Sequence, residues 1–206
     1  LTRSSAASDV YKRQGEGAQL ALRTNKCRFQ KLKGIFISHM HGDHVLGLPG
    51  VLSTMSLLGR TEALNVWGPP ELEGWLTKTW ESIDAHLSFS ILIHPWTTDA
   101  VSVLHEGERY RLLGIPVKHR IECCGLRVEE HSLQWSLNGS KIKKANLPFH
   151  VRQALKRGEF IEFDGQTLQP SMWGTAPRKA RSYVYSSDTR PCLSLIHISE
   201  PTRPID

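Results

Sequence analysis

The stretch that most constrains this chain is residues 35–44, which read IFISHMHGDH. An apolar run with strand character stops at three histidines and one aspartate within six positions. In an extended segment, residues two apart point to the same side, so His39 and His41 can offer two imidazoles to one cation. The following glycine permits a sharp turn, after which Asp43 and His44 can reach a second cation.

Imidazole and carboxylate together form the ligand set expected for zinc, with manganese or iron as alternatives. The other interpretation is a surface loop that happens to be rich in histidine. Four ligand-type side chains at the mouth of an apolar strand favour the metal site.

The two ends of the chain are related to each other through their possible codons. Residues 9–14 can be encoded by DNA whose reverse complement encodes residues 193–198. An inverted terminal repeat of this kind marks inserted DNA, so we interpret residues 1–14 and 193–206 as adaptor-like segments that are not native. We expect residues 15–192 to be an internal fragment that forms one domain or most of one.

Strand and helix patterns alternate after the histidine-rich stretch. Apolar residues three and four apart predict a helix over residues 45–58, which Gly59 ends, and a second helix over residues 71–85. This alternation favours an α/β fold built in layers. Strands are expected at residues 34–37, 64–67, 89–94, 101–104, 111–117 and 181–189.

Composition limits the binding partners that the chain can have and the cellular compartment in which it can work. The net charge of +6 is compatible with a nucleic-acid substrate, although it is weak support alone. No apolar run approaches the length of a membrane span, so we expect no membrane association. The four cysteines form no CxxC pair, and the adjacent Cys123 and Cys124 are poor disulfide partners, which favours a reducing cytoplasmic compartment.

The HxHxDH motif at residues 39–44 resembles the signature of the metallo-β-lactamase fold. Its flanks, GEGAQ at residues 15–19 and GLPG at residues 47–50, resemble the ribonuclease Z family, the endonucleases that mature the 3′ end of transfer RNA, and the short form most closely. The resemblance runs over residues 15–192. It implies a metallo-β-lactamase fold, an αββα four-layer sandwich truncated here at both ends, with two zinc ions and a homodimeric parent protein.

The resemblance also implies two further metal ligands. His119 lies in a PxxHxxxCxG pattern at residues 116–125 that matches the family's third metal motif, whereas a lone histidine after a strand would otherwise favour a structural role. Asp188 matches the aspartate that bridges the two metals. The implied ligand set is His39, His41 and His119 for one zinc, and Asp43 and His44 for the other, with Asp188 between them.

The implied reaction is phosphodiester hydrolysis by a water whose pKa the two zinc ions lower, with Asp43 accepting its proton. In the family, two more histidines complete the site, one as a metal ligand and one near the leaving oxygen. Both come from sequence beyond the position of Asp188, and residues 189–192 do not supply them. We therefore expect this polypeptide to be inactive or nearly so, although its parent is an enzyme.

Residues 129–169 depart from the layered pattern because basic side chains are interleaved with apolar ones. Composition alone favours an ordinary helical hairpin with a solvated basic face. In ribonuclease Z the interval at about 130–169 holds an arm that grips transfer RNA. The resemblance therefore implies RNA contacts by Lys141, Lys143, Lys144, Arg152, Lys156 and Arg157.

Two other classes of function stay open. Another hydrolase of the same fold, such as a small-molecule phosphodiesterase or an arylsulfatase, would share every metal ligand but lack the basic arm. A non-catalytic RNA-binding module would use the arm alone.

Overall fold

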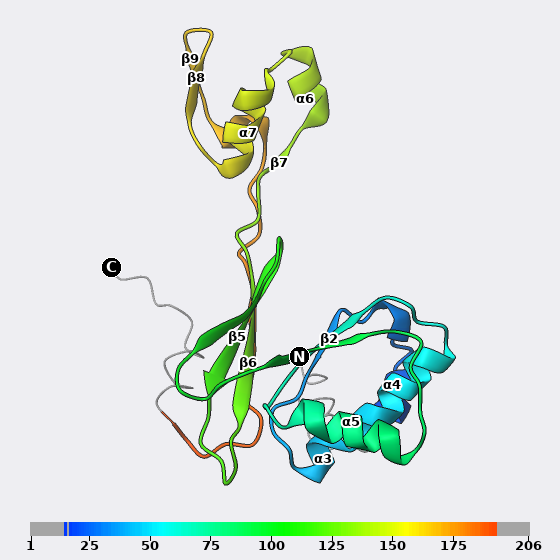
Figure 1. The fold of residues 1–206 in the computed structure, drawn as a ribbon. Coiled ribbons are helices and arrows are strands. Elements are labelled where there is room, and N and C mark those ends of the chain that lie inside the picture. Colours follow the sequence, from blue (N-terminus) through cyan, green and yellow to red (C-terminus); the bar gives the residue numbers. More distant parts are fainter. Residues whose placement is uncertain (1–14, 16, 193–206) are drawn as a thin grey trace. The chain divides into compact units, whose positions relative to one another are not determined.

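The chain divides into two compact units (Figure 1). This computed structural model describes residue 15 and residues 17–192, so the predictions about residues 1–14 and 193–206 lie outside the described residues. Among the described residues, the first unit comprises those of 15–107, 111–128 and 183–192, and the second comprises Glu108–Tyr110 and Glu129–Ser182.

The first unit contains a parallel sheet of three strands in the order β1-β2-β3, formed by β1 (Gly34–Phe36), β2 (Leu64–Gly68) and β3 (Ile91–Pro95). Helix α4 (Gly47–Leu57) leads from β1 to β2, and α5 (Leu72–Ser82) leads from β2 to β3. Right-handed crossovers that advance in the same direction place both helices on one face of the sheet. Figure 1 shows α4 and α5 together on one side of the three strands.

That face of the sheet carries the main apolar core. Leu64 and Val66 of β2 are fully buried, as are Leu52 and Met55 of α4, and Leu76 of α5 packs into the same cluster. Burial of this kind explains why β2 reads as an almost continuous apolar run, as strands of parallel sheets do.

The opposite face of the sheet packs on a second sheet. The indole Nε1 of Trp67 in β2 donates to the carbonyl oxygen of Leu104 at 3.0 Å, and Leu104 belongs to β4 (Ser102–Glu106). The Trp67 ring also stacks on His94, with ring centroids 5.4 Å apart. Nε2 of His94 in turn lies 2.8 Å from Asn65 Oδ1, so this histidine has a structural role.

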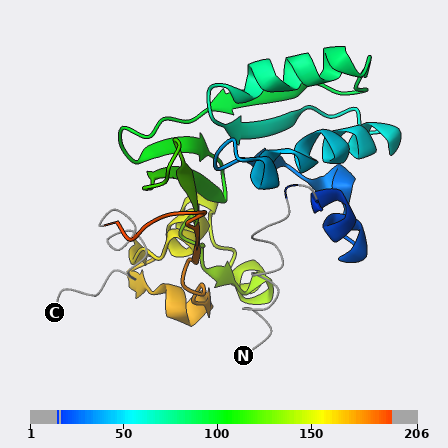
Figure 2. The same ribbon diagram turned by 90° about the horizontal axis from the view of Figure 1, so that it is seen from below.

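The second sheet has four strands in the order β11-β6-β5-β4. The strands besides β4 are β5 (Tyr110–Pro116), β6 (Cys124–Glu130) and β11 (Ser182–Tyr185). Together with the α4 and α5 layer, the two sheets form three layers of the predicted αββα sandwich, and Figure 2 shows the same layers from below. Within the described residues of the first unit, no helix follows a strand of the second sheet.

The predicted elements of the first unit are recovered with three differences, one of which is that β11 ends at Tyr185 and not at residue 189. The single helix predicted over residues 45–58 is wrong in its start, because α3 (Gly42–Val45) already includes two of the expected ligands and Leu46 separates it from α4. Gly59 adopts a φ of +79° just after α4, as the prediction of its end requires. Strand β6 was not predicted.

Two short segments pack around α4. Helix α2 (Ala18–Thr24) precedes β1, and its Gln19 amide donates to the Thr54 hydroxyl of α4. The 3-10 turn η1 (Phe29–Lys31) is tied to the end of α4 by Gln30, whose amide donates to the carbonyl oxygen of Leu58 at 2.8 Å.

The second unit is a small assembly of helices and hairpins with its own core. Leu147, Val151, Leu155 and Leu168 form this core. Its elements are β7 (Ser136–Leu137), α6 (Gly139–Lys144), α7 (Phe149–Arg157), β8 (Ile161–Phe163), β9 (Gln166–Leu168), α8 (Pro170–Trp173) and β10 (Gly174–Thr175). The unit includes the whole of the basic interval at residues 130–169.

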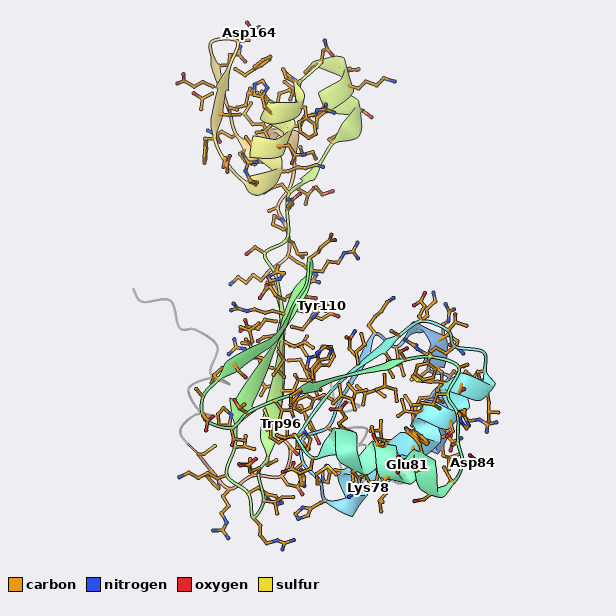
Figure 3. The ribbon with its side chains drawn as sticks, viewed as in Figure 1. Lys78, Glu81, Asp84, Trp96, Tyr110 and Asp164 are labelled. Atoms are coloured by element: carbon orange, nitrogen blue, oxygen red, sulfur yellow. The ribbon has the colours of Figure 1, made fainter. Side chains whose placement is uncertain are left out.

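The β8–β9 hairpin turns at Asp164 and Gly165, whose φ angles are +54° and +74°. Positive φ at both central residues is the geometry that an Asp-Gly pair favours. Figure 3 labels Asp164 at the tip of this hairpin. Among the helices of the described residues, none is long and apolar enough to cross a membrane.

Candidate metal centre

The histidine-rich stretch begins where β1 ends, and three distant segments fix its backbone. The Ile37 amide donates to the carbonyl oxygen of Trp67 in β2 at 2.8 Å. The Ile37 carbonyl accepts from Nε1 of Trp96, which is labelled in Figure 3, at 2.8 Å, and the Ser38 carbonyl accepts from the amide of Cys124 at 2.9 Å. The backbone that presents the first ligand is therefore held by hydrogen bonds on both sides.

Three imidazoles converge just beyond this point. His39 Nε2 lies 2.9 Å from His41 Nδ1, and His119 Nε2 lies 3.2 Å from the same atom. A tetrahedral site with metal–nitrogen bonds of about 2.0–2.1 Å separates its donor atoms by about 3.3 Å. The three nitrogens are therefore spaced as the ligands of one cation would be, and His119, which follows β5, joins the two histidines that precede α3.

A second group forms around His44, which is at the end of α3. Its Nε2 lies 3.5 Å from Asp43 Oδ2 and 3.5 Å from Asp188 Oδ2. This nitrogen is buried and has no hydrogen-bond partner among the described residues. Buried polar atoms normally have hydrogen-bond partners. An imidazole nitrogen that lacks one and lies between two carboxylates is therefore a suitable metal ligand.

The ligand-type atoms thus form two adjoining groups. One comprises His39, His41 and His119, and the other comprises His39, His44 and Asp188; within each group the ligand atoms lie within 4.8 Å of one another. Asp43 and Asp188 keep about half of their side chains exposed, so water or substrate can reach them. The residues fit one cation in the histidine group and a second beside His44.

The electrostatics of the site keep His39 neutral. Burial, together with the neighbouring imidazoles of His44, His41 and His119, lowers the pKa of His39 to about 4. A neutral imidazole is the form that binds a cation.

A serine pair sets the orientation of the His39 ring. Ser38 Oγ lies 3.0 Å from His39 Nδ1, and the Ser187 hydroxyl donates to Ser38 Oγ at 2.7 Å. If Nδ1 donates its proton to Ser38, Nε2 faces the other two histidines with a free lone pair. Ser187 directly precedes Asp188, so the pair also joins the two strand ends that carry ligands.

A buried cysteine lies beside the site, outside both groups of candidate ligands. Cys123 Sγ lies 3.6 Å from His39 Nδ1, and burial raises the pKa of this thiol to about 11. Cys27, Cys123, Cys124 and Cys192 are all free cysteines.

A cleft of about 670 Å³ adjoins His119 and is predominantly basic, because Lys118, Arg120 and Arg190 line it together with one acidic residue, Glu122. Arg120 Nη2 lies 2.9 Å from His41 Nε2, which places a guanidinium directly beside the histidine group. The Arg190 amide donates to the Lys118 carbonyl at 2.8 Å and holds the two sides of the cleft together. Such a cleft attracts an anionic group.

The sequence did not single out Arg120, Arg190, Ser38 or Ser187. Each of them lies within two residues of a predicted ligand in the sequence. This proximity is the sequence feature that could have identified them as residues of the site.

The six predicted RNA-binding residues all lie in the second unit, on α6 and α7. Lys143, Arg152 and Lys156 line one pocket of about 890 Å³. Lys141 and Lys144 line another of about 420 Å³. Arg157 instead pairs with Glu159, with Nε and Oε1 2.6 Å apart.

Comparison with known proteins agrees with this geometry. Ribonuclease Z of Bacteroides fragilis is 34% identical over 176 residues, which cover 85% of this chain and 58% of that protein. Ribonuclease Z of Porphyromonas gingivalis is 35% identical over 185 residues, which cover 89% of this chain and 61% of that protein. The chain thus spans about three-fifths of the length of these curated relatives, and the predicted resemblance is confirmed.

Among solved structures, the crystal structure of human tRNase Z, short form, matches with a TM-score of 0.52 and 29% sequence identity, over 57% of this chain and 51% of that chain. This likeness confirms the predicted metallo-β-lactamase fold. The sequence profile of the beta-lactamase superfamily domain matches residues 12–136, which include the HxHxDH motif and His119. The chain therefore belongs to the beta-lactamase superfamily.

Proposed function

We propose that this chain is the metal-binding part of a zinc-dependent endoribonuclease that removes 3′ trailers from transfer-RNA precursors. The observation that carries the proposal is the convergence of two ligand groups that share His39, beside a cleft lined by Lys118, Arg120 and Arg190. The curated relatives named Ribonuclease Z support the choice of substrate.

Zinc suits the site because neutral imidazoles and carboxylates are its ligands in hydrolases. In the proposal, His39, His41 and His119 hold one ion, Asp43 and His44 hold the other, and Asp188 lies between them. Zinc, when bound, lowers the pKa of water toward neutrality and stabilises negative charge on a phosphoryl group.

The chain's own residues perform the remaining tasks. Asp43 is half-exposed and 3.5 Å from His44 Nε2, so its carboxylate is placed to accept a proton from an attacking water. Arg120 and Lys118 bind and orient the phosphodiester by charge-assisted hydrogen bonds. Ser38 keeps the His39 ring in the orientation that the ligand role needs.

Two further parts of the proposal concern the surroundings of the site. The basic side chains of α6 and α7 contact the transfer RNA, and five of the six line pockets of the second unit. The parent enzyme is a homodimer of the cytoplasm, and the four free cysteines are compatible with that compartment.

A chimera tests the proposal directly. Residues 15–192 of this chain replace the matching segment of ribonuclease Z from Bacteroides fragilis, and a transfer-RNA precursor with a 3′ trailer is the substrate. We expect cleavage at the trailer junction, its loss in His41→Ala, and its retention in His86→Ala, which changes an exposed histidine outside both ligand groups. A folded, zinc-loaded chimera that does not cut the precursor would refute the proposal.

The alternative functions give different results in the same assay. A small-molecule phosphodiesterase would cleave bis(p-nitrophenyl) phosphate well and discriminate little between precursor RNA and unrelated RNA. A non-catalytic RNA-binding module would bind the precursor with equal affinity before and after His41→Ala and would cleave neither substrate.

A further inference from the structure

The second unit contains a pocket of about 890 Å³ that the metal centre does not use. Its floor is apolar, because Leu137, Ile142 and Leu147 line it and belong to or pack against the core of this unit. A floor of this kind suits the face of a ligand that is itself flat or apolar.

Two aromatic side chains stand at the pocket. Trp135 is half-buried, and its backbone amide donates to the carbonyl oxygen of Lys156 in α7 at 2.9 Å. Its indole lies against Gly158, the residue that follows α7. Phe149 opens α7 and is 67% exposed, although it lines the same pocket. An exposed phenyl ring beside an indole offers surface on which a planar group can stack.

The rim of the pocket is positively charged. Lys143, Arg152 and Lys156 line it, and none of its lining residues in the described part of the chain is acidic. The Arg152 guanidinium lies 5.8 Å from the centre of the Phe149 ring, and its buried Nε has no hydrogen-bond partner among the described residues. No carboxylate therefore pairs with this donor within the described part of the chain, in contrast to Arg157, which pairs with Glu159.

Amide side chains complete the lining. Gln134, Asn146 and Gln153 face the pocket and carry both donors and acceptors. The combination of an apolar floor, aromatic rings, unopposed cations and amides matches the chemistry of a nucleotide. A purely apolar peptide would leave three cations without partners, and an acidic peptide would leave the aromatic rings without a planar group.

We propose that this pocket receives one unpaired nucleobase of an RNA strand. The base stacks on Phe149 and Trp135, and Lys143, Arg152 and Lys156 bind the flanking phosphates. The inference rests on the proposed function for its RNA ligand, and it adds that the second unit engages a base as well as the phosphate backbone. A paired base cannot enter in this way, so the pocket distinguishes single-stranded from duplex RNA.

The test uses the full chain and two probes, a fluorescein-labelled single-stranded RNA decamer and the same strand in a duplex. Phe149→Ala should weaken binding of the single strand by roughly 5- to 150-fold and leave duplex binding unchanged, since stacking of one base on an aromatic ring has about this effect. Phe160→Ala is the matched control, because Phe160 is also 67% exposed and does not line the pocket. Lys156→Ala should weaken both probes.

Stacking is read out separately with 2-aminopurine in the decamer, whose emission falls when the base stacks. Wild-type chain and His41→Ala should quench it equally, whereas Phe149→Ala should not, so that loss of cleavage and loss of stacking are distinguished. The proposal is overturned if Phe149→Ala and Phe160→Ala behave alike, if the duplex binds as the single strand does, or if the wild-type chain binds neither probe at low salt.

Discussion

Replacing Trp96 by phenylalanine should weaken both the fold of the first unit and its affinity for zinc. Trp96 is 1% exposed, and its indole donates to the carbonyl oxygen of Ile37 at 2.8 Å, two residues before the first proposed ligand. Phenylalanine fills most of the same space but has no donor. The substitution therefore tests whether a buried hydrogen bond holds the ligand segment.

The expected magnitude follows from two contributions. A buried carbonyl left without its donor costs about 1–3 kcal/mol. The smaller ring leaves a cavity of roughly 35 Å³, which at about 24 cal/mol per Å³ costs about 1 kcal/mol. The free energy of unfolding should thus fall by about 2–4 kcal/mol, which lowers the urea midpoint by about 1–2 M for a slope near 2 kcal/mol per M.

Far-UV circular dichroism in urea measures the stability, and competition with a chromophoric chelator measures zinc affinity. The control is Trp80→Phe, which changes the same ring at a half-buried position of α5 and should lower stability by less than about 1 kcal/mol. Zinc affinity should fall about tenfold in Trp96→Phe and be unchanged in Trp80→Phe. An unchanged urea midpoint, or a reduced midpoint with unaltered zinc affinity, would refute the reasoning.

Three other perturbations follow from the same structure. Ser38→Ala removes the partner of His39 Nδ1 and should lower zinc affinity by about 10–100-fold, measured by chelator competition; an unaltered affinity would argue against the orienting role. The pKa of His39 is lowered to about 4 in the fold against an ordinary value near 6.5, so the unfolded chain binds more protons in this window. The free energy of unfolding of the metal-free chain should therefore fall by up to about 3 kcal/mol as the pH falls from 6.5 to 4, measured by urea titrations. In His39→Gln this part of the pH dependence should be absent. Gly165→Ala places a side chain at a φ of +74° and should lower the free energy of unfolding by about 1 kcal/mol or more. Gly139→Ala is the control and should lower it by less, because an added methyl there meets no atom within 4 Å. Equal urea midpoints for the two variants would contradict this prediction.

The strands, and the convergence of the histidines, could be predicted where the signal is local. The central strand β2 reads as an almost continuous apolar run because both of its faces are covered, and its predicted bounds lie within one residue of the observed ones. Strand β6 was not predicted, although residues 126–129 alternate apolar and polar side chains as a strand does. The position of β6 between β5 and β11 depends on its pairing with these two strands. A local sequence pattern does not indicate which strands pair.

In the second unit, too, local features can be predicted from the sequence and contacts between distant segments cannot. The Asp-Gly pair at residues 164 and 165 is a strong local hairpin signal, and it could have predicted β8 and β9. The pocket beside α7 could not be predicted in this way. It requires Trp135 to approach α7 from outside the helix, and that approach depends on the hydrogen bond between the Trp135 amide and Lys156.

The residues that hold the metal ligands are harder to predict than the ligands themselves. His39 lies in a segment without regular secondary structure, so no helix or sheet ladder fixes it. His41 is tied to α3 as its N-cap, because its carbonyl oxygen accepts from the amide of Val45 at 3.1 Å. Trp96, Cys124 and Ser187 hold this segment from three separate places in the chain, and each looks in the sequence like an ordinary core or turn residue. Because these contacts are few and each is a single hydrogen bond, metal affinity should respond to changes in the core that leave every ligand intact. A site of this kind is therefore specified by the ligand motif and by the core together, and only the motif can be read from the sequence.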